Sequence, residues 1–349
     1  MARVVGIDPG TVSIDVCGMV DGQLYLDQSW PTAEALDDPG TFIELLTSQG
    51  RPDLIVGPSG YGLPLLAASE VAEADLLLAF LAARDETGGI GGVRGLARQL
   101  GRSGLPVVYA PGVIHLDTVP EYRKLNRVDM GTADKLCAAV LGIHEQCGRR
   151  SHPPERSSFI LLELGGAFTG GVAVEKGQVV DGIGGTGGPI GWQAPGALDG
   201  EVAFLAGRVT KAALFQGGVG TLLARFPERR AQGIQAYVEG GVKTVRQLRC
   251  SAPSADEILL SGRHARSDEI RDPIAQQLAD IGPTRLLTGT ATEAKQGAEG
   301  AALLADGLSG GSAGDMVDRL RVRHAGGTVL DHLLFVSPET ARRRLGING

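Results

Sequence analysis

Residues 3–30, RVVGIDPGTVSIDVCGMVDGQLYLDQSW, return in outline as residues 159–183, FILLELGGAFTGGVAVEKGQVVDGI. Each stretch has an apolar run that ends near an acid, a glycine turn, a second run, a tight turn and a third run. The first tight turn is Asp21-Gly22, which is a strong hairpin signal between apolar runs. The second is Lys176-Gly177. An internal repeat of this kind predicts a chain of two matching halves.

After each repeated stretch, helical and strand patterns alternate, which predicts a mostly parallel sheet flanked by helices. The later strands are predicted at residues 52–57, 105–109, 257–260 and 285–288. The helices are predicted at residues 41–47, 71–84, 93–100, 132–143, 199–206, 219–226, 234–247, 268–281, 294–306, 315–324 and 338–345.

The polar, proline-containing stretch GRRSHPPERS, residues 148–157, has the composition of a linker. We therefore expect an N-terminal lobe over residues 1–150 and a C-terminal lobe over residues 151–349. The length of 349 residues agrees with two lobes, because a single core stops growing at roughly 250–300 residues.

The charge of the chain argues against a nucleic-acid partner, since 33 Lys and Arg against 40 Asp and Glu give a net charge of −7 with no dominant basic tract. The longest apolar stretch, residues 74–83, contains Asp75 and is too short to cross a bilayer. Met1 leads into a strand pattern without a secretion signal, so we expect a cytoplasmic protein with no membrane partner. The four cysteines lack metal-binding spacing. A homodimer is compatible with the sequence.

The first glycine turn is a candidate phosphate-binding site. Gly10 allows the backbone to approach a ligand closely, and Thr11 and Ser13 add hydroxyl groups to the backbone N–H groups of the turn. Asp8, at the end of the strand, is a candidate ligand of Mg²⁺, which prefers few carboxylates and many waters. A plain tight hairpin would have the same local sequence.

The second glycine turn has the same arrangement, with Glu163 as the acid and with Gly165, Gly166 and Thr169 in and after the turn. Two such turns that face each other can hold the β- and γ-phosphates of ATP from opposite sides. We therefore expect Mg-ATP between the halves, with the carboxylates of Asp8 and Glu163 near the metal.

A third candidate turn, Ser261-Gly262-Arg263, follows the predicted strand at residues 257–260. Ligands prefer the carboxyl ends of parallel strands, so we expect this turn to face the nucleoside, with an ordinary loop as the alternative. Gly297 and Gly300 lie three residues apart in a predicted helix, a spacing that allows close packing near a hinge between the lobes.

Two segments are candidates for binding the second substrate. The first, residues 182–199, is a long glycine-rich loop that contains Gly187 and Gly188, and loops of this length are often functional. The second, residues 115–134, leads into a predicted helix and carries several charged side chains. These include Arg123, Arg127, Asp129 and Asp134.

The chemistry expected of this second segment depends on the acceptor. Asp134 or Asp129 would act as the general base toward a hydroxyl group. A carboxylate acceptor is already ionised and needs no base, and Arg127 or Arg123 would then bind it bidentately. Together with Asp8, we assign Asp134 and Arg127 to the catalytic set. Helix capping is the alternative role for Asp129, and His115 of the same segment has the alternative of being an ordinary histidine.

The motifs GIDPGT, ELGGAFTGG and ILLSGR, in that order, resemble the superfamily of acetate and sugar kinases, Hsp70 and actin (ASKHA). That resemblance implies two ribonuclease-H-like lobes that close over Mg-ATP. Nearly the whole chain is similar to a largely archaeal family described as predicted butyrate kinases, which implies an ATP-dependent phosphotransferase. The segments that carry this likeness are VGPSGYGLPL (56–65), LNRVDMGTADKLCAAVLGI (125–143), GGTGGPIGWQAPGALDGEVA (184–203) and KAALFQGG (211–218).

The sequence therefore predicts a kinase that uses ATP and Mg²⁺ and a small-molecule acceptor, with a short-chain acid among the candidates. A nucleotide-driven switch with a protein partner, similar to actin or the chaperone ATPases, is the alternative. A ribonuclease-H-like nuclease, in which GIDPG also occurs, is disfavoured by the second glycine turn and by the net charge of −7.

Overall fold

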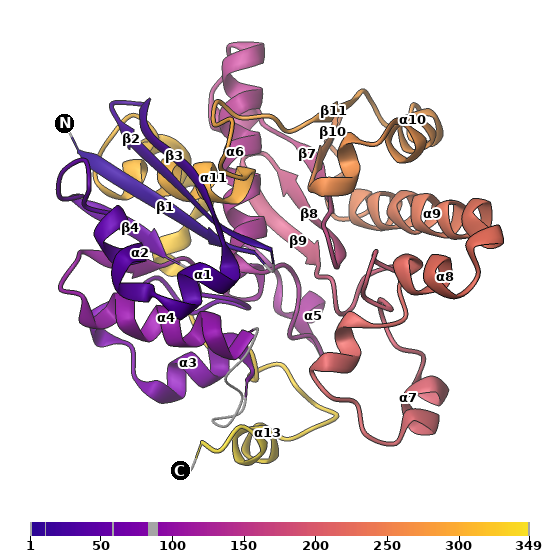
Figure 1. Cartoon of the computed structure of the whole chain (residues 1–349). Helices are drawn as coiled ribbons and strands as arrows, with labels where there is room; N and C mark the ends of the chain where they lie inside the picture. The colour runs from indigo at the N-terminus through magenta and orange to yellow at the C-terminus, as the bar shows by residue number, and fades with distance from the viewer. Residues whose placement is uncertain (1, 11, 58, 83–89, 348–349) are drawn as a thin grey trace.

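The computed structural model of the chain describes residues 2–10, 12–57, 59–82 and 90–347 (Figure 1). Thr11, one of the predicted phosphate-binding residues, lies outside the described residues. The elements form two mixed sheets with helices between and outside them, which confirms the predicted two-lobed α/β architecture.

The first sheet has six strands in the order β3-β2-β1-β4-β6-β5. β1 pairs antiparallel with β2 and parallel with β4. The turn between β2 and β3 is the predicted hairpin, since Asp21 and Gly22 have the positive φ angles of 51° and 73° that such a turn needs. The strands are β1 (Arg3–Pro9), β2 (Ser13–Val20), β3 (Gln23–Pro31), β4 (Leu54–Gly57), β5 (Leu66–Ala67) and β6 (Val107–Tyr109).

The second sheet repeats the start of the first. Its order is β11-β10-β7-β8-β9, with β7 antiparallel to β8 and parallel to β10. The predicted repeat is thus confirmed, because β7–β9 have the pairing of β1–β3. The strands are β7 (Phe159–Leu164), β8 (Thr169–Glu175), β9 (Gln178–Ile183), β10 (Ile258–Ser261) and β11 (Thr284–Leu286).

α6 and α11 lie between the two sheets, α1–α4 lie outside the first sheet and α8–α10 lie outside the second (Figure 1). In the described residues the helices are α1 (Thr32–Asp37), α2 (Pro39–Leu45), α3 (Glu73–Phe80), α4 (Ile90–Arg102), α5 (Glu121–Lys124), α6 (Ala133–Arg150), α7 (Gly200–Ala206), α8 (Val219–Arg225), α9 (Arg230–Arg249), α10 (Asp268–Gln277), α11 (Gln296–Leu308), α12 (Gly314–Leu320) and α13 (Pro338–Arg344). No helix among the described residues is long and apolar enough to cross a membrane.

The middle layer consists of α6 and α11, and each of these helices packs on the sheet formed by the other half of the chain. α11, from the second half of the sequence, packs on β1, β2 and β4 of the first sheet, whereas α6, from the first half, packs on β7 and β8 of the second. The two helices also pack on each other. Both helices begin near the edge of the sheets where the two glycine turns lie. Each half of the chain thus packs one helix against the sheet of the other half.

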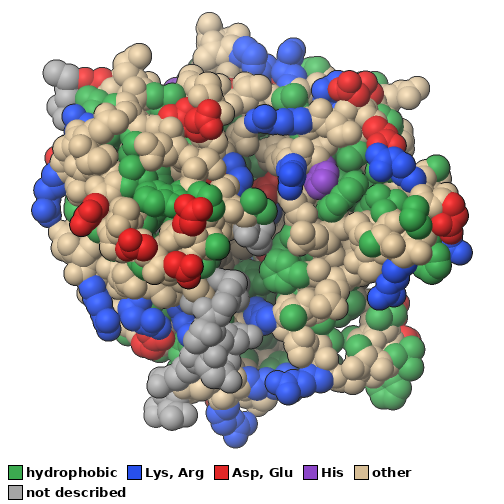
Figure 2. Space-filling model, viewed as in Figure 1, with side chains coloured by type: hydrophobic (Ala, Val, Ile, Leu, Met, Phe, Trp, Pro, Cys, Tyr) green, Lys and Arg blue, Asp and Glu red, His purple; other side chains and the backbone are tan. Residues whose placement is uncertain are grey.

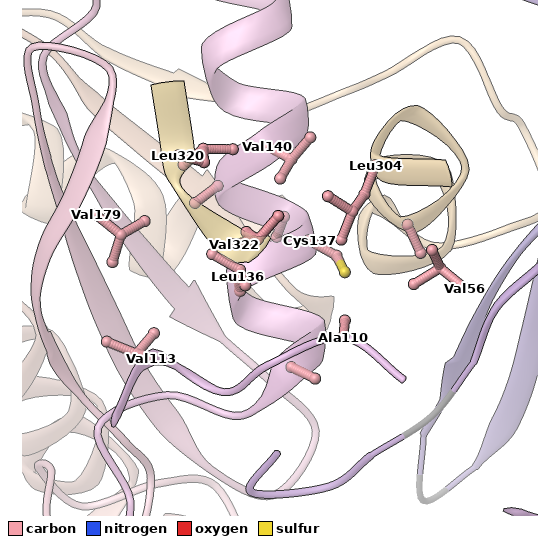
Figure 3. Close-up of a cluster of buried hydrophobic side chains, with 14 of the residues drawn as sticks. Val56, Ala110, Val113, Leu136, Cys137, Val140, Val179, Leu304, Leu320 and Val322 are labelled. Carbon is pink, nitrogen blue, oxygen red and sulfur yellow. The ribbon is translucent and has the colours of Figure 1, made fainter. Parts of the chain in front are cut away.

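A continuous apolar core holds this middle layer together. Cys137 and Val140 of α6 lie beside Leu304 of α11, with Val56 of β4 beyond them (Figure 3). The helices approach closely because a Cβ atom built on Gly300 would lie only 1.8 Å from the carbonyl oxygen of Cys137. This contact agrees with the close packing expected of Gly300.

The predicted linker begins too early at residue 148, because α6 continues to Arg150. Its last turn is held by ion pairs that come from the other half of the chain. Arg149 lies 2.9 Å from the buried carboxylate of Glu257, and Arg150 lies 2.8 Å from Asp256. The polar composition of this stretch thus marks a helix end bound to the second sheet.

Candidate active site

The first glycine turn lies between β1 and β2. The Gly10 N–H group donates a 2.8 Å hydrogen bond to the carbonyl oxygen of Ser13. Just before the turn, the buried Asp8 lies opposite Asp15 in the strand pair. The turn thus holds two carboxylates side by side at its base.

The second glycine turn, between β7 and β8, has the equivalent backbone hydrogen bond. The Gly165 N–H group donates to the carbonyl oxygen of Phe168 at 3.0 Å. Glu163 lies opposite Gly170, as Asp8 lies opposite its partner in the first turn. Between the two halves the molecular surface is hollowed, and basic side chains lie at the rim of the hollow (Figure 2).

Lys295 contacts the first turn from the start of α11. Its Nζ atom lies 2.6 Å from Asp15 Oδ2 and donates a 2.7 Å hydrogen bond to Ser13 Oγ. The side chain of Asp15 is fully buried, whereas that of Lys295 is 43% exposed. The ammonium group therefore compensates a buried charge and keeps one side open to a ligand.

Lys135 occupies the corresponding place at the second turn, from the first turn of α6. Its Nζ atom lies 3.5 Å from Glu163 Oε2 and 3.2 Å from Asp134 Oδ2. The Thr132 hydroxyl group donates to the other oxygen of Asp134. Each half of the chain thus supplies a lysine to the glycine turn of the opposite half.

The acids of this cluster differ in pKa. Burial, together with the nearby Asp134 carboxylate, raises the pKa of Asp8 to about 8, although Lys295 opposes the shift. Burial also raises the pKa of Glu163 above its usual value, and Lys135 only partly offsets it. Burial acts on Asp134 in the same direction, but the charge of Lys135 and the hydrogen bonds from Thr132 and Lys135 together hold the pKa of Asp134 below its usual value.

The cluster has a surplus of negative charge that fits a divalent cation. Four carboxylates face only two ammonium groups, and burial, with the neighbouring Asp134 carboxylate adding to it, raises the pKa of both Asp8 and Glu163. Among the described residues no three acidic, His or Cys side chains are grouped closely enough to hold a metal alone. Mg²⁺ fits such a site, because it is commonly bound by one or two carboxylates with waters and phosphate oxygens.

The third predicted turn lies directly against the second. Ser261 is opposite Glu163 in the parallel pair of β10 and β7. Gly262 has a φ of 89°, and a Cβ atom there would lie 2.5 Å from the carbonyl oxygen of Leu164. Only glycine fits this contact, and it brings the exposed Arg263 to the second turn.

An aromatic group covers the same side of the second half. Trp192 stacks on His264 with ring centroids 4.1 Å apart, and Tyr237 meets both rings edge-on. Burial and the neighbouring Arg263 lower the pKa of His264, so its ring is neutral at pH 7. The stack fastens the glycine-rich loop to the third turn.

The glycine-rich loop at residues 182–199 is held by both halves. Asp129 Oδ2 accepts hydrogen bonds of 3.0 Å from both the backbone N–H group and the hydroxyl group of Thr186. On the other side, a Cβ atom built on Gly188 would lie 2.8 Å from the carbonyl oxygen of Thr169. The loop therefore bridges the segment around Asp129 and the second glycine turn.

The two candidate arginines have different surroundings. Arg127 is exposed and lies beside Gly187, and its guanidinium makes no hydrogen bond or ion pair with the described residues. Arg123 donates a 2.7 Å hydrogen bond to the carbonyl oxygen of Val180 and lies 3.9 Å from Asp181. The guanidinium of Arg123 is thus engaged with β9, while that of Arg127 is open beside the loop.

His115, in contrast, lies away from these groups as a buried side chain. Burial lowers the pKa of His115 to about 4, and its carbonyl oxygen accepts the N–H group of Gly326. The Nδ1 atom of His115 is buried and has no hydrogen-bond partner among the described residues, and the interpretation of His115 as an ordinary histidine stays a prediction.

Sequence patterns did not single out three side chains of the cluster, which are those of Asp15, Lys135 and Lys295. A comparison of the halves contains a signal for the two lysines. Lys135 lies in ADKL at the start of α6, and Lys295 lies in EAKQ at the start of α11, the two helices that cross between the halves. A comparison of the two halves that included these helices as well as the strands would have matched Lys135 with Lys295.

Comparison with known proteins places the chain in a family and in a fold. The model of the family described as "Protein of unknown function (DUF1464)" matches residues 6–335. No curated protein matches the chain in sequence.

Solved structures of carboxylate kinases share the fold. A propionate kinase from Francisella tularensis subsp. tularensis SCHU S4 has a TM-score of 0.59 at 14% identity, covering 86% of this chain and 99% of that one. The acetate kinase of Entamoeba histolytica has a TM-score of 0.57 at 11% identity, covering 80% and 87%. That of Porphyromonas gingivalis has a TM-score of 0.55 at 12% identity, covering 81% and 88%. At such identities the likeness shows the two-lobed kinase fold.

Proposed function

The chain belongs to the DUF1464 family, and from that premise and the geometry of the site we propose that it is an ATP-dependent phosphotransferase. The observation that carries the proposal is the pair of equivalent glycine turns, each with a lysine from the opposite half. Phosphoryl transfer depends on positioning and charge neutralisation, and this arrangement supplies both from two sides.

The turns and lysines are suited to the phosphates of ATP. N–H groups of the two turns and the hydroxyl group of Ser13 would bind phosphate oxygens, and Lys295 and Lys135 would neutralise their charge. The third turn, at Ser261–Arg263, would bind the nucleoside. Asp8 and Glu163 would hold Mg²⁺ directly or through water, and the cation would neutralise charge on the phosphates when bound.

The acceptor in this proposal is a small carboxylate. Both candidate bases are already engaged, since Asp134 binds Thr132 and Lys135, and Asp129 binds the loop at Thr186. The lowered pKa of Asp134 also makes it a weak base at pH 7. An acceptor that arrives ionised needs no base, and the open guanidinium of Arg127 suits a carboxylate.

In the proposed reaction a carboxylate oxygen attacks the γ-phosphorus of ATP. The bond between that phosphorus and the β–γ bridging oxygen breaks, and ADP leaves with its electron pair. The products are ADP and an acyl phosphate. Lys135, between the halves, would stabilise the charge of the transferring group, and the loop bound to Asp129 would limit the access of water.

The test is an assay of the full chain with Mg-ATP against a panel of acetate, propionate, butyrate, glycerol and glucose. Hydroxylamine traps acyl phosphates as hydroxamates, so ADP and hydroxamate should form in equal amounts with one of the acids. ADP formation at one rate with or without every acceptor would favour the switch ATPase. Failure of calorimetry to detect ATP, ADP or a non-hydrolysable analogue would overturn the proposed function.

A further inference from the structure

The segment that joins β11 to α11, residues 288–294 with the sequence TGTATEA, donates all seven of its backbone N–H groups to carboxylates. These carboxylates belong to Glu145 of α6, Glu299 of α11 and Asp27 of β3. The three acids come from three different elements, so the segment is fixed by the middle layer and by the first sheet together.

The contacts follow the alternating threonines of the segment. Glu145 accepts the N–H groups of residues 288 and 289 at 3.1 and 2.6 Å, and Glu299 accepts those of residues 290 and 291 at 2.8 and 3.0 Å. Asp27 accepts those of residues 292, 293 and 294 at 2.7, 3.2 and 2.7 Å. Each acid also accepts one threonine hydroxyl group.

The residue that follows this segment is Lys295, whose ammonium group lies on Ser13 and Asp15 at the first glycine turn. A lysine side chain has four rotatable bonds and loses much entropy when it is held in one place. Its position therefore depends on where its own backbone is fixed. Asp27 fixes that backbone up to residue 294, one residue before the lysine.

We propose that Asp27 is a positioning residue that aims Lys295 at the first phosphate turn, an inference that rests on the proposed function. β3 pairs with β2, and Asp27 lies opposite Cys17, two residues beyond Asp15 on the strand that follows the turn. The acid that holds the lysine's backbone and the acid that binds its ammonium group thus belong to the same sheet. Lys295 belongs to the second half of the chain, but the backbone just before it and its ammonium group are both held by acids of the first half.

Glu145 provides a matched control in the same segment. It accepts two backbone N–H groups and a threonine hydroxyl group, as Asp27 accepts three and one, but it lies on α6 and binds six residues or more before Lys295. Asp27→Asn and Glu145→Gln both replace a carboxylate by an amide of equal size. A general loss of stability would affect both variants alike, whereas a loss of lysine positioning would affect only the first.

The first readout is the rate at which an N-hydroxysuccinimide ester acetylates Lys295 in the full chain without ligands, measured by mass spectrometry. We expect Asp27→Asn to raise this rate roughly tenfold, since a charge-assisted contact is worth about one order of magnitude, and Glu145→Gln to leave it unchanged. Equal rates in the two variants would overturn the inference, and this readout does not depend on whether the protein is a kinase.

The second readout is kinetic and uses Lys295→Met as the background. Asp27→Asn should raise KM for ATP about tenfold in the wild-type chain and less than about twofold in the Lys295→Met chain, because residues that act through one group are not additive. Full additivity would contradict the positioning role. Absence of ATP turnover in the wild-type chain would instead count against the proposed function, and the acetylation result would still decide the inference.

Discussion

The two glycine turns have equivalent backbone hydrogen bonds but different side chains. In the first turn the position opposite the acid is Asp15, which pairs with Lys295. In the second it is Gly170, and the Cε atom of Lys135 lies 3.3 Å from where a Cβ atom on that glycine would be. The same position in both turns is therefore where the lysine of the opposite half lies.

The side chains at the ends of the two turns also differ. Ser13 at the end of the first turn binds the ammonium group of Lys295, whereas its counterpart Phe168 packs edge-on against Phe215, with ring centroids 4.9 Å apart. The first turn thus has the Ser13 hydroxyl group and a partly exposed lysine beside the exposed Val12, and the second has the packed ring of Phe168 and a buried lysine, Lys135. On the proposed function, we expect the first turn to contribute mainly to ATP binding and the second mainly to the transfer step.

The largest effect should come from Lys135→Met at the second turn. We expect kcat to fall roughly 10³-fold, because a buried cation near a transferring phosphoryl group stabilises charge that water cannot screen. Unpaired Asp134 and Glu163 should also cost about 3–5 kcal/mol in the free energy of unfolding without Mg²⁺, and urea denaturation measures this. Lys243→Met, at an exposed lysine of α9 that pairs with Glu239, is the control. Near-normal turnover in a folded Lys135→Met chain would contradict a role of the second turn in the transfer step.

A smaller effect is expected for Lys295→Met at the first turn. Because this lysine is half-exposed, its loss should raise KM for ATP roughly 10-fold, the usual weight of one charge-assisted hydrogen bond, and change kcat less. Steady-state kinetics with varied Mg-ATP separates the two constants. A fall in kcat as large as that of Lys135→Met would mean that the two turns do not divide binding from transfer.

Gly170→Ala tests the space that the second turn leaves for its lysine. The new Cβ atom would lie 2.8 Å from the carbonyl oxygen of Ile183 as well as near Lys135, so the strand must shift. We expect a loss of about 1–3 kcal/mol in the free energy of unfolding by thermal or urea denaturation. Gly166→Ala, in the same turn but with no atom within 4 Å of the new Cβ, should change it little. Equal values for the two variants would show that Gly170 is not needed for close packing.

The smallest effect is a pH dependence confined to the second half. Burial lowers the pKa of His264. As the pH falls, this histidine is therefore protonated in the unfolded chain before it is protonated in the folded chain. The contribution of the neutral ring to the free energy of unfolding is lost below about pH 6.5. Trp192 stacks on this ring, and in a Trp30→Phe background its fluorescence should change with a midpoint below pH 6.5. His264→Gln should abolish that titration. A midpoint above pH 6.5 would show that the ring is not in the environment described.

Much of the fold was predictable because its signals are local. The acid, glycine turn and hairpin of each repeat lie within about 30 residues, and the structure confirms both copies. The end of α6 was mispredicted because the ion pairs of Arg149 and Arg150 join it to acids more than 100 residues away. Of the candidate site, Gly10 and Ser13 lie at the first turn and Gly165, Gly166 and Thr169 lie at or just after the second, while every role assigned to a site residue stays a prediction.

The two repeated modules, the alternating elements between them and the residue types at the turns follow from the sequence, since backbone preference and apolar periodicity act over short distances. Which lysine contacts which turn depends on the packing of the helices. Lys135 reaches Glu163 and Lys295 reaches Asp15 because α6 and α11 pack on each other's sheets, a choice governed by burial of their small and apolar faces in one shared core. Contacts between groups 28 and 280 residues apart have no local signal, because they depend on how whole elements pack.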